Sequence, residues 1–301
     1  MSRVREGTRV KRSFADQVIQ VLIYVFLAVF AVATILPFLY VLAGSFATQR
    51  ELIERTFFII PREISFNAYK YIADKGDVLR GLWNSVFVTV AGTIINMVFT
   101  TSFAYPLSRK DFIGRTPILQ LVIISMVFSG GMIPSFLVIK ELNLLNTWWA
   151  LFLPGAISAY NMVIIKNFFE AIPNELHEAA TMDGCNDLWI MIKIILPLSK
   201  PVLASISLFY AVGHWNSYFA PMMYISDEEK EVIQIVLRRI VLLSNGIDTN
   251  GTMLDFGMLE APPDRAVKMA VTVVATVPIL LVYPFVQKYF TKGVMVGAVK
   301  G

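Results

Sequence analysis

Residues 170–200 read EAIPNELHEAATMDGCNDLWIMIKIILPLSK. Pro173 ends any helix that precedes it, and Asn174 is a favourable residue for the N-cap of the next helix. Glu175 and Glu178 then place negative charge in the first turns, where the helix dipole favours it. Gly184 supplies the left-handed conformation that commonly ends a helix. The segment therefore predicts a short helix that closes on a glycine bend.

A second short helix is predicted directly after the bend. It can start at Asn186 or Asp187 and run through an apolar stretch until Pro197 stops it. A helix that exposes small residues beside a carboxylate, as the run 178–180 does here, can lie in a groove of another protein while the charge fixes its register. The alternative is an amphipathic helix that rests on lipid headgroups.

The composition of the whole chain is that of a membrane protein. Of its 301 residues, 56% are hydrophobic and 16% charged, and the mean hydropathy is +0.64. A soluble domain carries about 45–50% apolar and about 25% charged residues. Cys185 is the only cysteine, which excludes disulfides within the chain and clusters of thiolate ligands. The net charge of +4 is spread along the chain, so we expect no nucleic-acid partner.

Six apolar runs have the length of about 20 residues that crosses a bilayer. They are Val18–Gly44, Asn84–Leu107, Pro117–Ile139, Trp148–Phe169, Pro201–Ile225 and Ala266–Phe290. We therefore expect an all-α integral membrane protein with six transmembrane helices. A cleaved signal peptide is the alternative for the first run, but that run continues well past the 7–15 residues of a typical signal core.

Basic residues indicate the orientation of these spans. They gather in the N-terminal tail, in the turn after the second span and near the C-terminus: Arg3, Arg5, Arg9, Lys11 and Arg12; Arg109, Lys110 and Arg115; Lys288, Lys292 and Lys300. By the positive-inside rule, both termini are expected to be cytoplasmic. The predicted organisation is a tail at 1–17, a membrane domain at 18–290 with external connections 45–83 and 226–265 and a cytoplasmic loop 170–200, and a tail at 291–301.

The cytoplasmic loop resembles a known motif. At every fixed position, its residues match the EAA loop of permease subunits of ATP-binding-cassette (ABC) importers: Glu178, Ala179, Ala180, Gly184, Ile194, Leu196 and Pro197. Outside the loop, three segments are similar to permeases of the carbohydrate-uptake branch, specifically those of oligosaccharide and lipoprotein-linked sugar uptake systems. These segments are His214–Tyr218, Ile235–Arg239 and Gly293–Gly301.

The resemblance implies a type I ABC importer fold, like that of the maltose importer, in the cytoplasmic membrane of a bacterium. It also implies several partners: a second homologous permease, two ATPase subunits that bind ATP and magnesium, an external solute-binding protein that delivers the sugar, and membrane lipid. In this family the EAA loop forms a coupling helix in the ATPase cleft. Glu178 would meet a basic residue there and Gly184 would form the bend, with Ala179, Ala180, Asp183, Ile194, Leu196 and Pro197 completing the coupling residues.

The chain itself carries no motif for energy conversion or catalysis. It has no GxxxxGK[ST] phosphate-binding loop, so energy must come from a partner or from an ion gradient. An ion-gradient-driven transporter is the alternative, but Lys166 and Lys268, the charges near the spans, lie close to predicted membrane edges and are expected to snorkel. His177–Thr181 narrowly misses the HExxH zinc motif, because Thr181 replaces the second histidine. We therefore expect a transport subunit with no catalytic site, cofactor or metal.

Polar residues in three spans are candidates for a sugar path. In the second span, Thr89, Thr93, Asn96 and Thr100 recur at helical spacing on one face. In the fifth span Tyr210, His214 and Tyr218 recur at intervals of four and are predicted to form an aromatic and polar strip, with Trp215 and Asn216 beside it. The fourth span offers Tyr160 and Asn161 after a Pro154-Gly155 break. The alternatives are packing between helices for the threonines, an aromatic belt at the membrane interface for Trp215 and Tyr218, and a simple kink at Pro154.

The external connection 226–265 is predicted to be a loop with one short helix around Val232–Leu243. It either docks the solute-binding protein or is merely solvated. Arg238 and Arg239 can favour an acidic saccharide, but the identity of the sugar is left open by these residues.

Overall fold

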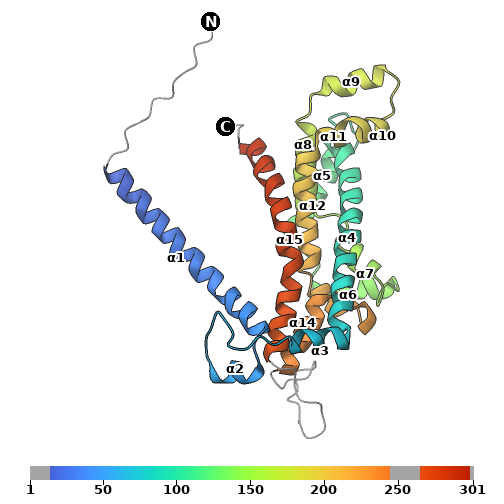
Figure 1. Ribbon diagram of the computed structural model, residues 1–301. Helices are drawn as coiled ribbons and strands as arrows, with labels where there is room; N and C mark the ends of the chain where they lie inside the picture. Colours follow the sequence, from blue (N-terminus) through green and yellow to red (C-terminus); the bar gives the residue numbers. More distant parts are fainter. Residues whose placement is uncertain (1–13, 245–264, 299–301) are drawn as a thin grey trace. The chain divides into compact units, whose positions relative to one another are not determined.

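The computed structural model describes residues 14–244 and 265–298, and the secondary structure of this part is helical throughout (Figure 1). The chain divides into two compact units, one made of Met1–Tyr69 with Asp264–Val273 and the other of Lys70–Pro263 with Val274–Gly301. The basic residues of the predicted N-terminal tail lie outside the described residues, as do Lys300 and most of the second half of the connection 226–265.

The first unit contains α1 (Phe14–Ser45), α2 (Gln49–Glu54), the start of α3 (Asn67–Lys75) and the start of α15 (Arg265–Ala298). None of the most apolar window of α1 is buried. A helix that is apolar and exposed all round suits a lipid environment. The loop after α2 is held by Glu51, whose carboxylate accepts the backbone N–H of Arg62 and pairs with Arg55 at 2.6 Å.

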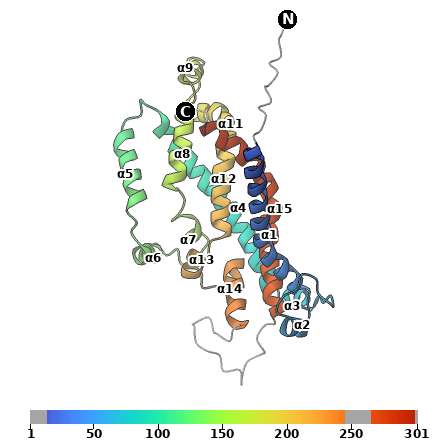
Figure 2. The ribbon, with the colours of Figure 1, turned by 90° about the vertical axis from the view of Figure 1, so that its left-hand side faces the viewer.

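The second unit is built around α4 (Asp77–Ser108), which packs against α8 (Ala159–Glu170), α12 (Lys200–Trp215) and α14 (Ile233–Ser244). Its other elements are, in chain order, α5 (Arg115–Val127), α6 (Met132–Glu141), α7 (Trp149–Phe152), α9 (Asn174–Met182), α10 (Asp187–Ile190), the π-helical turn η1 (Met191–Ile195), α11 (Leu196–Leu198), α13 (Phe219–Tyr224) and the short η2 (Glu228–Lys230). Figures 1 and 2 both place α9–α11 at one end of α4, α8 and α12, and α14 at the other. The loops predicted on opposite sides of the membrane therefore lie at opposite ends of these helices.

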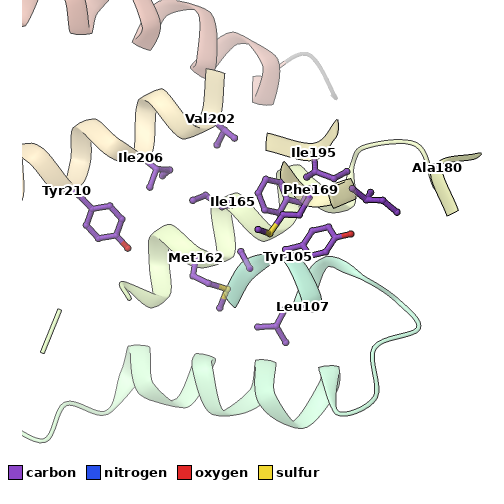
Figure 3. Close-up of a cluster of buried hydrophobic side chains, with 13 residues drawn as sticks. Tyr105, Leu107, Met162, Ile165, Phe169, Ala180, Ile195, Val202, Ile206 and Tyr210 are labelled. Atoms are coloured by element: carbon purple, nitrogen blue, oxygen red, sulfur yellow. The ribbon is translucent and has the colours of Figure 1, made fainter. Parts of the chain in front are cut away.

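A core of buried apolar side chains fills the space between α4, α8 and α12 on the side of the 170–200 loop (Figure 3). Leu107 of α4, Ile165 of α8 and Ile206 of α12 are each at most 1% exposed. Ile190 and Ile195, from the second half of the loop, belong to the same cluster. The loop is thus anchored in the core mainly by its second half, while α9 contributes only Ala180 to the core.

Three predicted spans are confirmed as long apolar helices, and three are not single straight helices. The long helices are α1, α4 and α15. The third predicted span is bent by 118° between α5, which ends at Val127, and α6, whose N-cap is Gly131 with a φ of +83°. The fourth breaks at 153–158, as the Pro154-Gly155 pair predicts, and the fifth ends as a helix at Trp215 before α13 begins. The count of six spans remains a prediction.

The second predicted span starts too late, because α4 begins at Asp77 rather than at Asn84. Two polar residues near the start of α4, Asn84 and Ser85, hydrogen-bond residues from the connection before α14 and its first turn. Asn84 donates to the backbone carbonyls of Glu229 and Glu231, and Ser85 accepts the N–H of Ile233 at 2.8 Å. α14 itself confirms the short helix that was predicted around 232–243.

Candidate functional site

The helix, bend and helix predicted for the 170–200 loop are confirmed. α9 ends at Met182, Gly184 has a φ of +82°, and Cys185 returns its N–H to the carbonyl of Ala180 at 3.0 Å. Asn186 caps α10 by accepting the N–H of Trp189 at 2.8 Å. The cap of α9 differs from the prediction, since Pro173 occupies the N-cap and Asn174 is the first helical residue. The side chain of Asn174 is thereby freed for another contact.

Pro197 does not stop the second helix, contrary to the prediction. The chain passes from α10 through the π-helical turn η1 into α11, which contains Pro197. Pro197 is the second residue of α11, and a proline is tolerated in the first turn of a helix. The break falls instead at Ser199, where the axis turns by 86° into α12.

The residues of the EAA motif divide into an exposed and a buried set. Glu178, Ala179, Asp183 and Gly184 are exposed. Ala180 is only 6% exposed and belongs to the core, so the prediction that it shares the exposed face with Ala179 is wrong. Ile194 and Leu196 pack against the same core, and Pro197 is exposed. The exposed part of the motif is therefore Glu178 and Ala179 of α9 together with the bend after them.

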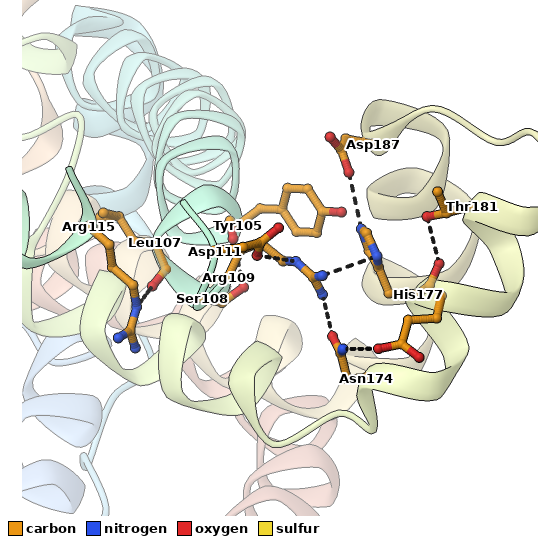
Figure 4. Close-up of polar contacts among 11 residues, drawn as sticks. Tyr105, Leu107, Ser108, Arg109, Asp111, Arg115, Asn174, His177, Thr181 and Asp187 are labelled. Atoms are coloured by element: carbon orange, nitrogen blue, oxygen red, sulfur yellow. Dashed lines mark hydrogen bonds and ion pairs between the residues drawn. The ribbon is translucent and has the colours of Figure 1, made fainter. Parts of the chain in front are cut away.

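Arg109, in the turn after α4, holds α9 in place (Figure 4). One guanidinium nitrogen donates to Oδ1 of Asn174 at 3.0 Å, and the other lies 3.1 Å from Nδ1 of His177. Nε2 of His177 lies 3.1 Å from a carboxylate oxygen of Asp187. Asn174 in turn donates to the carboxylate of Glu178 at 2.6 Å. The motif glutamate is thereby connected to α4 through two hydrogen bonds.

A second charged cluster fixes the end of α8 just before the loop. Glu170 accepts from Arg115 at 2.9 Å and from Lys166, and Arg115 also donates to the carbonyl of Leu107. The hydrogen bond from Lys166, together with the charges of Lys166 and Arg115, holds the pKa of Glu170 below its ordinary value despite partial burial. Lys166 is 9% exposed, so the expectation that it snorkels to the membrane surface is wrong.

A cavity of about 1070 Å³ opens between α9 and the ends of α4 and α8. Its walls include Tyr105, Arg109, Glu170, His177 and Glu178. The inner face of α9 is therefore not packed against the core along its length, and the polar contacts of Arg109 bridge this space.

Several candidates for the sugar path form hydrogen bonds between helices. Asn96 is 1% exposed; its amide donates to the carbonyl of Gly155 and its oxygen lies 2.6 Å from Nε2 of His214. The hydroxyls of Thr100 and Tyr210 hydrogen-bond at 2.7 Å, and Tyr210 also accepts the N–H of Ser158 at 3.0 Å. These contacts satisfy backbone groups at the break between α7 and α8, and for Thr100 they favour the packing alternative.

The remaining path candidates fall into two groups. Asn161 and Trp215 are 7% exposed, whereas Tyr160 is 60% exposed and Asn216 is exposed. Tyr218 lies beyond the end of α12, so the expectation that Tyr210, His214 and Tyr218 form a strip on one helix is wrong. The hydroxyls of Thr89 and Thr93 have no hydrogen-bond partner within the described part of the chain.

Close packing of Gly92 on His214 gives a test of this polar cluster. A Cβ at position 92 would lie 2.5 Å from Nε2 of His214, whose ring is fixed by Asn96. We therefore expect Gly92→Ala to destabilise the protein by about 1–3 kcal/mol, the usual effect of overpacking. Thermal unfolding in detergent measures the change. Gly213→Ala is the matched control, because a Cβ there meets nothing within 4 Å; equal unfolding midpoints for the two variants would contradict the cluster.

Comparison with known proteins identifies the chain. Residues 112–296 match the family model described as binding-protein-dependent transport system inner membrane component. The chain belongs to this family. A permease protein of Bacillus subtilis, YtcP, is 51% identical over 95% of this chain and 99% of the relative, and LplC of the same organism is 50% identical over 95% and 96%.

A solved structure supports the same assignment. One chain of a bacterial ABC transporter has a TM-score of 0.85 and 31% identity, covering 93% of this chain and 99% of that one. The predicted all-helical permease fold and the prediction of an ABC transport subunit in the inner membrane are thereby confirmed. The family assignment decides against the ion-gradient alternative.

Sequence reasoning missed the residues that hold the loop. In the sequence, Arg109 was used only as a positive charge that indicates the orientation of the spans. His177 was considered only because His177–Thr181 nearly matches the HExxH zinc motif. The contacts of Arg109 with Asn174 and His177 span 65 and 68 positions of the chain. A local sequence pattern does not predict a contact between residues so far apart in the chain. Only the helix signals around Asn174 and Gly184 could be recognised in the sequence.

Proposed function

We propose that this permease carries an acidic oligosaccharide. The observation that carries the proposal is the agreement of two relatives: YtcP is named for the transport of polygalacturonan and rhamnogalacturonan, and the ABC transporter of known structure for the import of the acidic polysaccharide alginate. Two AraQ permeases, named for arabinooligosaccharides, are 26–27% identical, so a neutral oligosaccharide is the second candidate.

Arg238 is the residue that best fits recognition of an acidic sugar. It is exposed on α14, and its guanidinium lies 5.3 Å from the ring centre of Tyr218. An arginine beside an aromatic face offers a carboxylate a charged donor and a sugar ring an apolar surface. The neighbouring Arg239 is engaged by Glu231 at 2.9 Å and lies within 4 Å of Asp77 and Glu228, so its charge is balanced within the chain.

The 170–200 loop supplies the connection to the energy source. We propose that Glu178, Ala179, Asp183 and Gly184 face the ATPase subunit. Ala180, Ile194 and Leu196 hold that surface on the core, and the exposed Pro197 follows them in α11. The partners would be a second homologous permease, two ATPase subunits and an external solute-binding protein. The proposal includes six spans and cytoplasmic termini, which place the loop on the ATPase side.

Substitution of the motif glutamate tests the coupling role. Glu178→Lys reverses the charge that faces the partner, and Gly184→Pro cannot adopt a positive φ. We expect the subunit to stay in the membrane while ATP-driven uptake falls by about 100-fold, because an interfacial charge pair becomes a repulsion. Uptake into proteoliposomes measures the effect. Glu175→Lys, on the same helix but outside the motif, is the control; uptake that survived both motif substitutions would exclude the assigned role.

The substrate class is tested at Arg238. We expect Arg238→Gln to raise the KM for uptake of trigalacturonate about 10-fold, the effect of one charge-assisted hydrogen bond, and to leave uptake of maltotriose unchanged. Lys70→Gln, an exposed charge in the first external connection, is the control. Uptake of maltotriose but not of trigalacturonate by the unsubstituted complex would favour the neutral candidate instead.

A further inference from the structure

α9 is attached to the rest of the chain by two short connections. Residues 171–173 join it to α8, and the bend around Gly184 joins it to α10. The cavity of about 1070 Å³ behind it leaves its inner face without continuous packing. A helix with short connections at both ends and a cavity behind it depends on side-chain contacts for its position.

Arg109 supplies such contacts from the end of α4. Its guanidinium bonds Asn174 and His177, which are three residues apart on one face of α9. The Arg109 side chain is 22% exposed and that of His177 14% exposed, so water competes only partly for these bonds. Two attachment points one turn apart restrain both the position and the rotation of α9.

The chemistry of the guanidinium fixes the proton on His177. Arginine has donors and no acceptor, so Nδ1 of His177 must accept. The proton of the neutral ring then lies on Nε2, which donates to Asp187, the first residue of α10. Arg109 thus holds α9 directly and the start of α10 through the imidazole.

α4 carries the restraint into the predicted membrane region. Asn96 and Thr100 lie on α4, and Arg109 follows the last residue of this helix. Asn96 donates to the carbonyl of Gly155, and Thr100 hydrogen-bonds Tyr210, which accepts the N–H of Ser158. Both residues therefore contact the break between α7 and α8 directly or through one side chain. A displacement imposed at the end of α4 therefore reaches these contacts along one continuous helix of 32 residues.

We propose that Arg109, acting through Asn174 and His177, is a positioning residue that makes α9 and α4 move together. With the contact intact, a push of the ATPase on α9 displaces α4; without it, α9 pivots about 171–173 and Gly184 and the push is lost. The proposal rests on the proposed coupling role of the loop.

The test uses the complete transporter, with both permeases, the ATPases and the binding protein, in proteoliposomes. Uptake of trigalacturonate or maltotriose, whichever the unsubstituted complex carries, is measured together with ATP hydrolysis. We expect Arg109→Ala to lower the sugar imported per ATP hydrolysed by about 10-fold, the effect of charge-assisted hydrogen bonds, with the ATPases still bound. Arg109→Lys is expected not to restore it, since one ammonium cannot repeat the forked contact. Lys110→Ala, the exposed neighbour, is the control.

Two replacements of His177 separate its two contacts. The amide oxygen of His177→Asn can accept from Arg109 as Nδ1 does, whereas the longer His177→Gln places its amide near Nε2 and Asp187. We expect the asparagine variant to keep the transport ratio within about threefold of the original. The glutamine variant is expected to lower the ratio, but by less than Arg109→Ala, because the bond between Arg109 and Asn174 remains. The double variant Arg109→Ala/His177→Gln is expected to be no worse than Arg109→Ala alone, because Arg109→Ala already removes the contact that His177→Gln removes.

The ratio of transport to hydrolysis distinguishes positioning from a folding defect, since a loss of folded complex lowers both quantities equally. An unchanged ratio in Arg109→Ala and His177→Gln overturns the proposal. If Glu178→Lys then still abolishes uptake, the coupling role of the loop stands without Arg109; if it does not, the proposed function fails as well.

Discussion

The guanidinium of Arg109 joins the longest helix of the second unit to a helix that the hydrophobic core does not hold. Elsewhere the 170–200 loop is anchored by apolar side chains, among them Ile190 and Ile195, but α9 contributes only Ala180 to the core. Directed hydrogen bonds therefore replace packing at this point. Such bonds fix orientation without burying the surface that has to remain open for another protein.

α4 and α12 together satisfy the backbone where a predicted span is broken. Inside a bilayer, unpaired N–H and carbonyl groups are costly, so irregular backbone needs partners from neighbouring helices. Asn96 donates to the carbonyl of Gly155, and Tyr210 accepts the N–H of Ser158, both at the break between α7 and α8. α4 thus has polar contacts at three levels: with the loop after η2, with the break, and with α9.

Much of this could be predicted from the sequence, because the signals are local. Hydropathy located the apolar segments, Gly184 and Asn186 marked the bend and the cap, and the motif spacing gave the family. What failed depended on context: the π turn that carries the chain past Pro197, and the inward orientation of Ala180. The contacts of Arg109 and Asn96 join residues far apart in the sequence, and the hydrophobic pattern does not encode them.

The central claim, that the 170–200 loop is a cytoplasmic surface covered by the ATPase, is tested most directly with Cys185. This thiol is exposed beside the glycine bend and is the only cysteine of the chain. A membrane-impermeant maleimide should label it in inverted vesicles but not in right-side-out vesicles, and bound ATPase subunits should protect it. Labelling from the outside, or labelling unaffected by the ATPases, would contradict the account.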